Sequence, residues 1–172
     1  MEYYKRVLLI LIILFSCVGC DQVSKVAAHK YLAHSLPVSY LYDIFRLQYA
    51  ENKGAFLSLG SAFAEEFRFW LLIVFTGVVV SGMLVFILLN RTLNPFFGIS
   101  ISLIVGGGVG NLIDRMTNDG AVIDFMNIGI GCLRTGIFNF ADAAIIIGIG
   151  MLIFVRLNRT RSRMTEREHR WF

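Results

Sequence analysis

The chain has 172 residues, of which 56% are apolar and only 16% are charged. Soluble domains carry about 25% charged residues, so this composition excludes an ordinary soluble domain and favours a protein of the lipid bilayer. The net charge of +4 comes largely from an arginine-rich C-terminal tail. Such a tail is typical of a topology signal on anionic lipid, and we expect no nucleic-acid partner.

The first predicted element is an apolar helix over residues 7–28. Lys5 and Arg6 precede an uncharged run, and this pattern imitates a secretory signal peptide. The apolar run continues past Asp21, however, and three further apolar runs follow it. We therefore expect a membrane span that is retained.

The loop that follows this helix has the pattern of a β-strand. Phe45, Leu47 and Tyr49 alternate with more polar neighbours, which is the period of a half-buried strand. A turn is predicted over 52–54, and the apolar run resumes over 55–57. This outer loop should form a small sheet on the membrane surface.

The remaining apolar runs predict three more membrane spans. Phe69–Leu89 alone gives 21 uncharged residues, enough for one span. A glycine-rich run over 106–110 lies in the predicted span over 96–115. It lacks the Lys-Ser/Thr ending of a phosphate-binding loop, so we expect it to allow close packing between helices. We expect a membrane all-α fold in a single domain, 1–172, with helices over 7–28, 68–89, 96–115 and 138–157, outer loops over 29–67 and 116–137, and the arginine-rich tail over 158–172.

The distribution of Lys and Arg predicts the orientation of these helices. Nine basic residues lie at the chain start, in the 90–95 connection and in the tail, whereas at most seven are spread over the much longer loops on the other side. The side richer in short-loop basic residues is the cytoplasmic one. Both termini of this multi-pass membrane protein should therefore be cytoplasmic.

Three aspartates are expected at one depth near the outer leaflet. At 1.5 Å per residue, Asp21 lies roughly 24 Å along its helix from Lys5, and Asp142 lies roughly 21 Å from Arg156. Asp114 lies roughly 30 Å from Asn94, whereas the hydrocarbon core is about 30 Å thick. The alternative function is a transporter that uses acids as a proton relay. Such a protein would have its acids spread across the membrane depth, whereas these cluster on one side.

The neighbours of these acids leave two interpretations open. Asp21 with Lys25, which share one helical face, and Asp114 with the adjacent Arg115 are interpreted either as structural ion pairs near helix ends or as parts of a site. Asp142 has no basic residue after it until Arg156, so it is either protonated or part of a site.

Asp124 is the fourth acid of interest, because it is embedded in an apolar, strand-like run. Two carboxyls in an apolar setting share one proton, so one can activate water while the other donates to a carbonyl. This is the aspartic-protease arrangement, and it needs neither metal nor cofactor. The three cysteines and three histidines lack metal-ligand spacing, so we expect no metal.

Five segments, in order, resemble the bacterial lipoprotein signal peptidase (signal peptidase II). The resemblance covers roughly residues 5–155. Its segments are Asp21–Lys25, Asn52–Phe56, Gly106–Arg115, Val122–Phe125 and Phe138–Asp142.

The resemblance implies that Asp124 and Asp142 are the catalytic pair of an aspartic endopeptidase. It further implies residues that bind substrate or support the site: Asp21, Lys25, Asn52, Gly54, Asn111, Asp114, Arg115, Asn139 and Ala141. The implied partners are membrane lipid and a prolipoprotein whose cysteine bears diacylglycerol, cut just before that cysteine, and the enzyme is expected to be a monomer. Residues 131–137 depart from the family pattern, because they lack its frequent Trp and Pro, which leaves the conformation of that loop open.

Overall fold

Four long apolar helices form the body of the molecule. The computed structural model describes residues 2–55 and 59–168, with side chains described as far as residue 158. Within this part of the chain, four helices are long and apolar enough to cross a membrane, which confirms the predicted fold class. They are α1 (Tyr3–Leu32), the continuous helix made of α2 (Glu65–Arg68), η2 (Phe69–Phe75) and α3 (Thr76–Leu89), then α4 (Pro95–Thr117), and α5 (Phe140–Glu168) as far as residue 158.

Helix α4 packs against α1, α3 and α5. Its glycines make this possible, because a Cβ added to Gly106 would lie 2.7 Å from Cys17 of α1, and one at Gly108 would lie 2.7 Å from Val80 of α3. A Cβ at Gly107 would collide with the carbonyl oxygen of Ala141 in α5. The glycine run is therefore a packing surface, as the sequence predicted.

The start of α4 and the end of α3 are fixed by local chemistry. The Asn94 side chain accepts a hydrogen bond from Phe96 N (2.8 Å), and Pro95 is pre-organised for the first helical position. At the same end of the molecule, Tyr3 Oη donates to Leu88 O (3.2 Å) and the buried Arg6 donates to Ile87 O. Because the last carbonyls of a helix lack intrahelical donors, α1 satisfies the end of α3.

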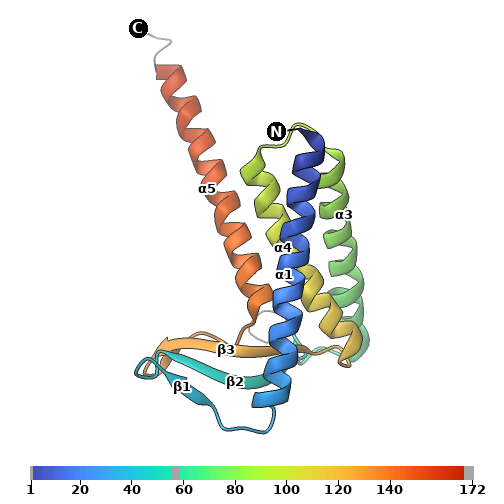
Figure 1. Ribbon diagram of the computed structural model, residues 1–172, viewed down its shortest axis with the longest axis vertical. Coiled ribbons are helices and arrows are strands. Elements are labelled where there is room, and N and C mark those ends of the chain that lie inside the picture. Colours follow the sequence, from blue (N-terminus) through green and yellow to red (C-terminus); the bar gives the residue numbers. More distant parts are fainter. Residues whose placement is uncertain (1, 56–58, 169–172) are drawn as a thin grey trace.

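A four-stranded antiparallel sheet lies at the opposite end of the helices (Figure 1). Its order is β1 (Val38–Tyr40), β2 (Phe45–Asn52), β3 (Val122–Ile130) and β4 (Leu133–Arg134). β2 is the strand predicted in the first outer loop, and β3 contains the strand-like run around Asp124; β3 and β4 both come from the second long loop. Residues 56–58 lie outside the described part of the chain, so the resumed apolar run over 55–57 is described only at Ala55.

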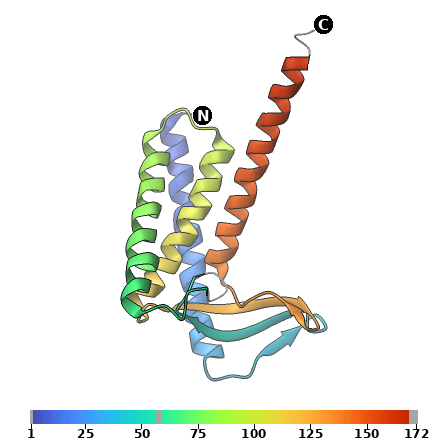
Figure 2. The same ribbon diagram turned by 180° about the vertical axis from the view of Figure 1, so that it is seen from behind.

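The sheet is attached to the helices through α1 and α5. Ala28 near the end of α1 packs against Phe125 and Met126 of β3. Phe138, just before α5, forms a bridge with Met126. Seen from behind, α5 rises from the sheet and diverges from the other three helices (Figure 2). This junction of β3, α4, α5 and α1 is where the polar side chains converge.

Candidate active site

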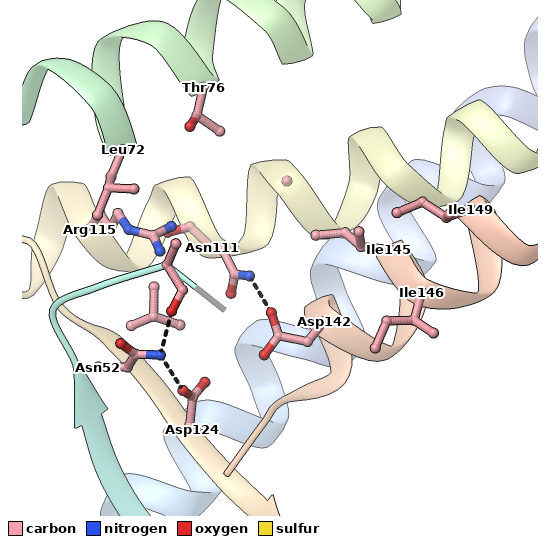
Figure 3. Close-up of a pocket in the computed structure, with 13 residues that line it drawn as sticks. Asn52, Leu72, Thr76, Asn111, Arg115, Asp124, Asp142, Ile145, Ile146 and Ile149 are labelled. Atoms are coloured by element: carbon pink, nitrogen blue, oxygen red, sulfur yellow. Dashed lines mark hydrogen bonds between the residues drawn. The ribbon is translucent and has the colours of Figure 1, made fainter. Parts of the chain in front are cut away.

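Asp124 and Asp142 line one cavity of about 440 Å³ (Figure 3). Asp124 lies on β3 and is 2% exposed, whereas Asp142 lies in the first turn of α5 and is half-buried. The polar end of the cavity also includes Asn52, Asn111 and Arg115. Its other end is apolar and is formed by Ile145, Ile146 and Ile149 of α5.

Asn139 connects the two acids. Its Nδ2 donates to Asp124 Oδ1 (2.7 Å), and its backbone N donates to Asp142 Oδ2 (3.2 Å). In return, the Asn139 side-chain oxygen accepts from Asp142 N (2.9 Å), so the pair forms a reciprocal cap at the start of α5. Because Asn139 and Asp142 are three residues apart, the same pair of hydrogen bonds starts α5 and orients the Asp142 carboxyl.

Each acid also accepts a hydrogen bond from a second amide. Asn52 Nδ2 donates to Asp124 Oδ2 (3.0 Å), and Asn111 Nδ2 donates to Asp142 Oδ1 (2.9 Å). Burial and the nearby charge of Asp142 raise the pKa of Asp124 to about 6, although the bonds from Asn52 and Asn139 act in the opposite direction. The cavity therefore holds a carboxyl that retains its proton far more readily than an exposed one.

Arg115 joins α4 to the turn that follows Asn52 at the end of β2. Its Nη2 donates to Gly54 O (2.9 Å), and the Gly54 N–H donates to Asn52 Oδ1 (2.9 Å). The structure contains no Arg115–Asp114 ion pair among its described residues, so that structural interpretation is wrong. Arg115 instead fixes the amide of Asn52 that contacts Asp124.

Behind the cavity, Lys25 forms two buried ion pairs. Its Nζ lies 2.7 Å from Asp21 Oδ2, as the helical spacing predicted, and 2.9 Å from Asp114 Oδ2. Asp21 Oδ1 also accepts from the Ala141 backbone N (2.9 Å). Asp114 is thus paired, but with a residue of another helix.

The structure brings all the residues singled out in the sequence to one end of the molecule. Gln22 was not among the predicted site residues, yet its Nε2 donates to Asp114 Oδ1 (2.8 Å) and to Gly110 O (3.2 Å). Gln22 follows Asp21 directly, so helical spacing does not place the two on one face. The apolar wall was also missed, because isoleucines and leucines fill every span alike. Among the described residues, no group of three or more His, Cys, Asp or Glu is arranged to hold a metal ion.

Comparisons with known proteins point to one family. A family model described as signal peptidase (SPase) II matches residues 12–158. A lipoprotein signal peptidase from Chlorobium phaeovibrioides is 36% identical over 150 residues, covering 82% of this chain and 85% of the relative. One from Burkholderia cenocepacia is 38% identical over 146 residues, with 82% of each chain covered. A solved structure of a bacterial membrane enzyme is similar with a TM-score of 0.76 and 26% identity, covering 88% of each chain.

Proposed function

The chain belongs to the signal peptidase II family, and from this premise we propose that it is an aspartic endopeptidase that removes signal peptides from lipid-modified prolipoproteins. The cut falls just before a cysteine that bears diacylglycerol. The observation that carries this proposal is the pair of acids, Asp124 and Asp142, lining one cavity and connected by Asn139.

The chemistry follows from two carboxyls that hold one proton between them. The charged carboxyl takes a proton from water as the water oxygen attacks the scissile carbonyl carbon, and the neutral carboxyl donates its proton to the carbonyl oxygen. Collapse of the resulting diol then breaks the C–N bond, and a proton passes to the amine of the cysteine. The raised pKa of Asp124 supports this scheme, because it keeps a proton available close to neutral pH. The proton belongs to the pair rather than to one residue.

The shape of the cavity suits a lipidated peptide. Its polar end presents acids and amides to a peptide bond, and its apolar end reaches Ile146 and Ile149, which are exposed on the surface of α5. An acyl chain can therefore stay in lipid while the peptide reaches the acids. We place this site at the outer leaflet of the bacterial inner membrane, with both termini in the cytoplasm, and we propose a monomer.

A cleavage assay with matched substrates tests the proposal. Purified protein is incubated with a diacylated prolipoprotein and with the same chain lacking lipid, and we expect only the first to be cut. Asp124→Asn and Asp142→Asn should each abolish cleavage while remaining folded, since each replaces a carboxyl by an amide that cannot exchange the proton. The matched control is Asp119→Asn, because Asp119 is exposed and lies outside this cavity.

Two results would contradict the proposal. Equal cleavage of the lipidated and unlipidated chains would remove the substrate assignment. Substantial cleavage by either folded dyad variant, measured beside an active Asp119→Asn control, would remove the aspartic mechanism.

A further inference from the structure

Lys25 is an ammonium group enclosed by protein. It lies on α1, is only 2% exposed, and does not line the cavity that holds Asp124 and Asp142. Its Nζ has three acceptors, namely Asp21 Oδ2 at 2.7 Å, Asp114 Oδ2 at 2.9 Å and Asn111 Oδ1 at 3.0 Å. A protonated lysine has three N–H donors, so the three acceptors use all of them.

Each of these three acceptors leads to one of the two acids. Asp21 accepts from the backbone N of Ala141, the residue before Asp142 (2.9 Å). Asp114 accepts from the backbone N of Ile123, the residue before Asp124 (3.0 Å). The third acceptor, Asn111, is bonded to Asp142 itself, because its side-chain nitrogen donates to the Asp142 carboxyl. Lys25 is therefore linked to the acid pair in three ways.

The link through Asn111 fixes which way its side-chain amide is turned, as well as where it lies. An amide can turn over and exchange its oxygen and nitrogen, but an ammonium has only donors and must face the oxygen. Lys25 therefore holds Asn111 Oδ1, which leaves Asn111 Nδ2 to donate to Asp142 Oδ1 (2.9 Å). Asn139 Nδ2 supports the same orientation by donating to Asn111 Oδ1 (3.1 Å).

We propose that Lys25 is a positioning residue for peptide cleavage, which fixes the amide of Asn111 and the backbone segments beside both acids. Lys25 does not line the cavity, so it would act through these groups and not on the peptide bond itself. This inference rests on the proposed function, because it assigns a role within the same reaction.

The charges around Lys25 give this role a measurable signature. Lys25 pairs with Asp21 from α1 and with Asp114 from α4, and its charge also acts on Asp124 of β3. Asp114, Asp124 and Asp142 act in turn on Arg115 of α4, and Asp114 acts on Tyr49 of β2. The positive charge of Lys25 lowers the pKa of Asp124, opposing the effect of burial. Removing that charge should move the pH limb of kcat that reports the acid pair to higher pH.

The test compares Lys25→Met with Arg6→Met in the purified full-length protein, using the diacylated substrate. Both variants delete a buried cation, but Arg6 lies near the start of α1, far along that helix from Lys25, and donates to Ile87 O at the end of α3. We expect Lys25→Met to lower kcat on the order of 10- to 100-fold, as loss of a group that orients a reacting side chain does, with KM close to that of the wild type. The pH limb should move upwards in Lys25→Met and stay in place in Arg6→Met, even where both variants melt at lower temperature.

A second variant guards against misfolding, because Lys25→Met leaves Asp21 and Asp114 buried without their cation. Lys25→Met/Asp21→Asn restores the charge balance, and the asparagine oxygen can still accept from Ala141 N. We expect this double variant to be more stable than Lys25→Met yet still low in kcat, because nothing holds Asn111.

Recovery of wild-type kcat and pH limb by the double variant would overturn the inference, since Lys25 would then serve only charge balance. Wild-type kinetics in Lys25→Met would overturn it directly. Either result leaves the proposed function intact, provided that the wild type cleaves only the lipidated substrate. A wild type that fails to cleave this substrate would overturn the proposed function instead.

Discussion

At the scale of single residues, the burial of Asp124 raises its pKa and lowers the stability of the folded protein where this carboxyl is ionised. It is almost fully buried, and its carboxyl is surrounded by amide donors rather than by a cation at bonding distance. Burial raises the pKa of Asp124 from its ordinary 3.8 to about 6. An acid whose pKa is raised by folding favours the folded state at low pH, where the acid is protonated. This contribution is lost as the pH rises through the pKa of the folded state.

Asp124→Asn should therefore stabilise the protein in a pH-dependent way. Near pH 4 the variant and the wild type should have similar stability, and the advantage of the variant should grow up to about pH 6 and then stay constant, because each pKa unit corresponds to about 1.4 kcal/mol. The full gain is up to about 3 kcal/mol. Thermal unfolding in detergent across this pH range measures it, with Asp119→Asn as the exposed control. A gain that is equal at all pH values would contradict the burial of an ionisable group here.

Sequence spacing predicted ion pairs only where both partners belong to one helix. Asp21 and Lys25 are four residues apart on α1 and do pair, whereas Asp114 ignores the adjacent Arg115 and pairs with Lys25. That choice depends on how α1 and α4 pack, which no local pattern contains. The motifs beginning at Asn111 and Asn139 look alike in the sequence, yet one lies inside α4 and the other caps α5. Their different roles come from where each helix begins.

At the scale of elements, α4 determines how closely the helices that carry the site can approach. Gly107 touches the backbone of Ala141, next to Asp142, and a Cβ on Gly110 would lie 2.6 Å from Asp21 Oδ2. The glycines therefore do more than allow packing: they bring α1 and α5 close enough for Asp21 to accept from Ala141 N (2.9 Å).

Gly107→Ala should reduce both stability and activity. The added methyl group would meet the Ala141 carbonyl, which belongs to the backbone and cannot turn away, so we expect a destabilisation of about 1–3 kcal/mol and a loss of cleavage. Gly82→Ala on α3 is the matched control, because a Cβ there meets nothing within 4 Å, and alanine favours a helix by up to about 1 kcal/mol. Thermal unfolding and the cleavage assay check both variants, and equal behaviour of the two would refute the packing role of α4.

The sequence pattern indicated β2 more clearly than β3, because the two strands differ in burial. β2 alternates polar and apolar residues because it is partly buried along most of its length, so its period of two is visible. The first six residues of β3 are buried, and a buried strand has no such alternation. The pairing of β2 with β3, including the irregular register between Leu47 and Ala50, joins loops that lie far apart in the chain.

At the scale of the whole molecule, polar and apolar interactions are separated along the helices. The buried cluster of Ile10, Val80, Ile87, Ile101 and Val105 fills the part of the bundle away from the sheet. The buried acids and amides gather beside the sheet instead, around β3 and the start of α5. A relay that carries protons through a membrane needs polar groups along its whole depth, so this separation suits a reaction at one surface.

The orientation of the molecule can be tested with its exposed Cys132, which lies between β3 and β4. If the sheet faces away from the cytoplasm, a maleimide that cannot cross membranes should label Cys132 in intact spheroplasts, and Cys132→Ser should remove the signal. Thr92→Cys in that background places a thiol in the exposed connection between α3 and α4, and it should react only after permeabilisation. The reverse pattern would put the acids beside the cytoplasmic leaflet. Substrates that carry lipid in the outer leaflet could not then reach Asp124 and Asp142, so the proposed site of action would be wrong.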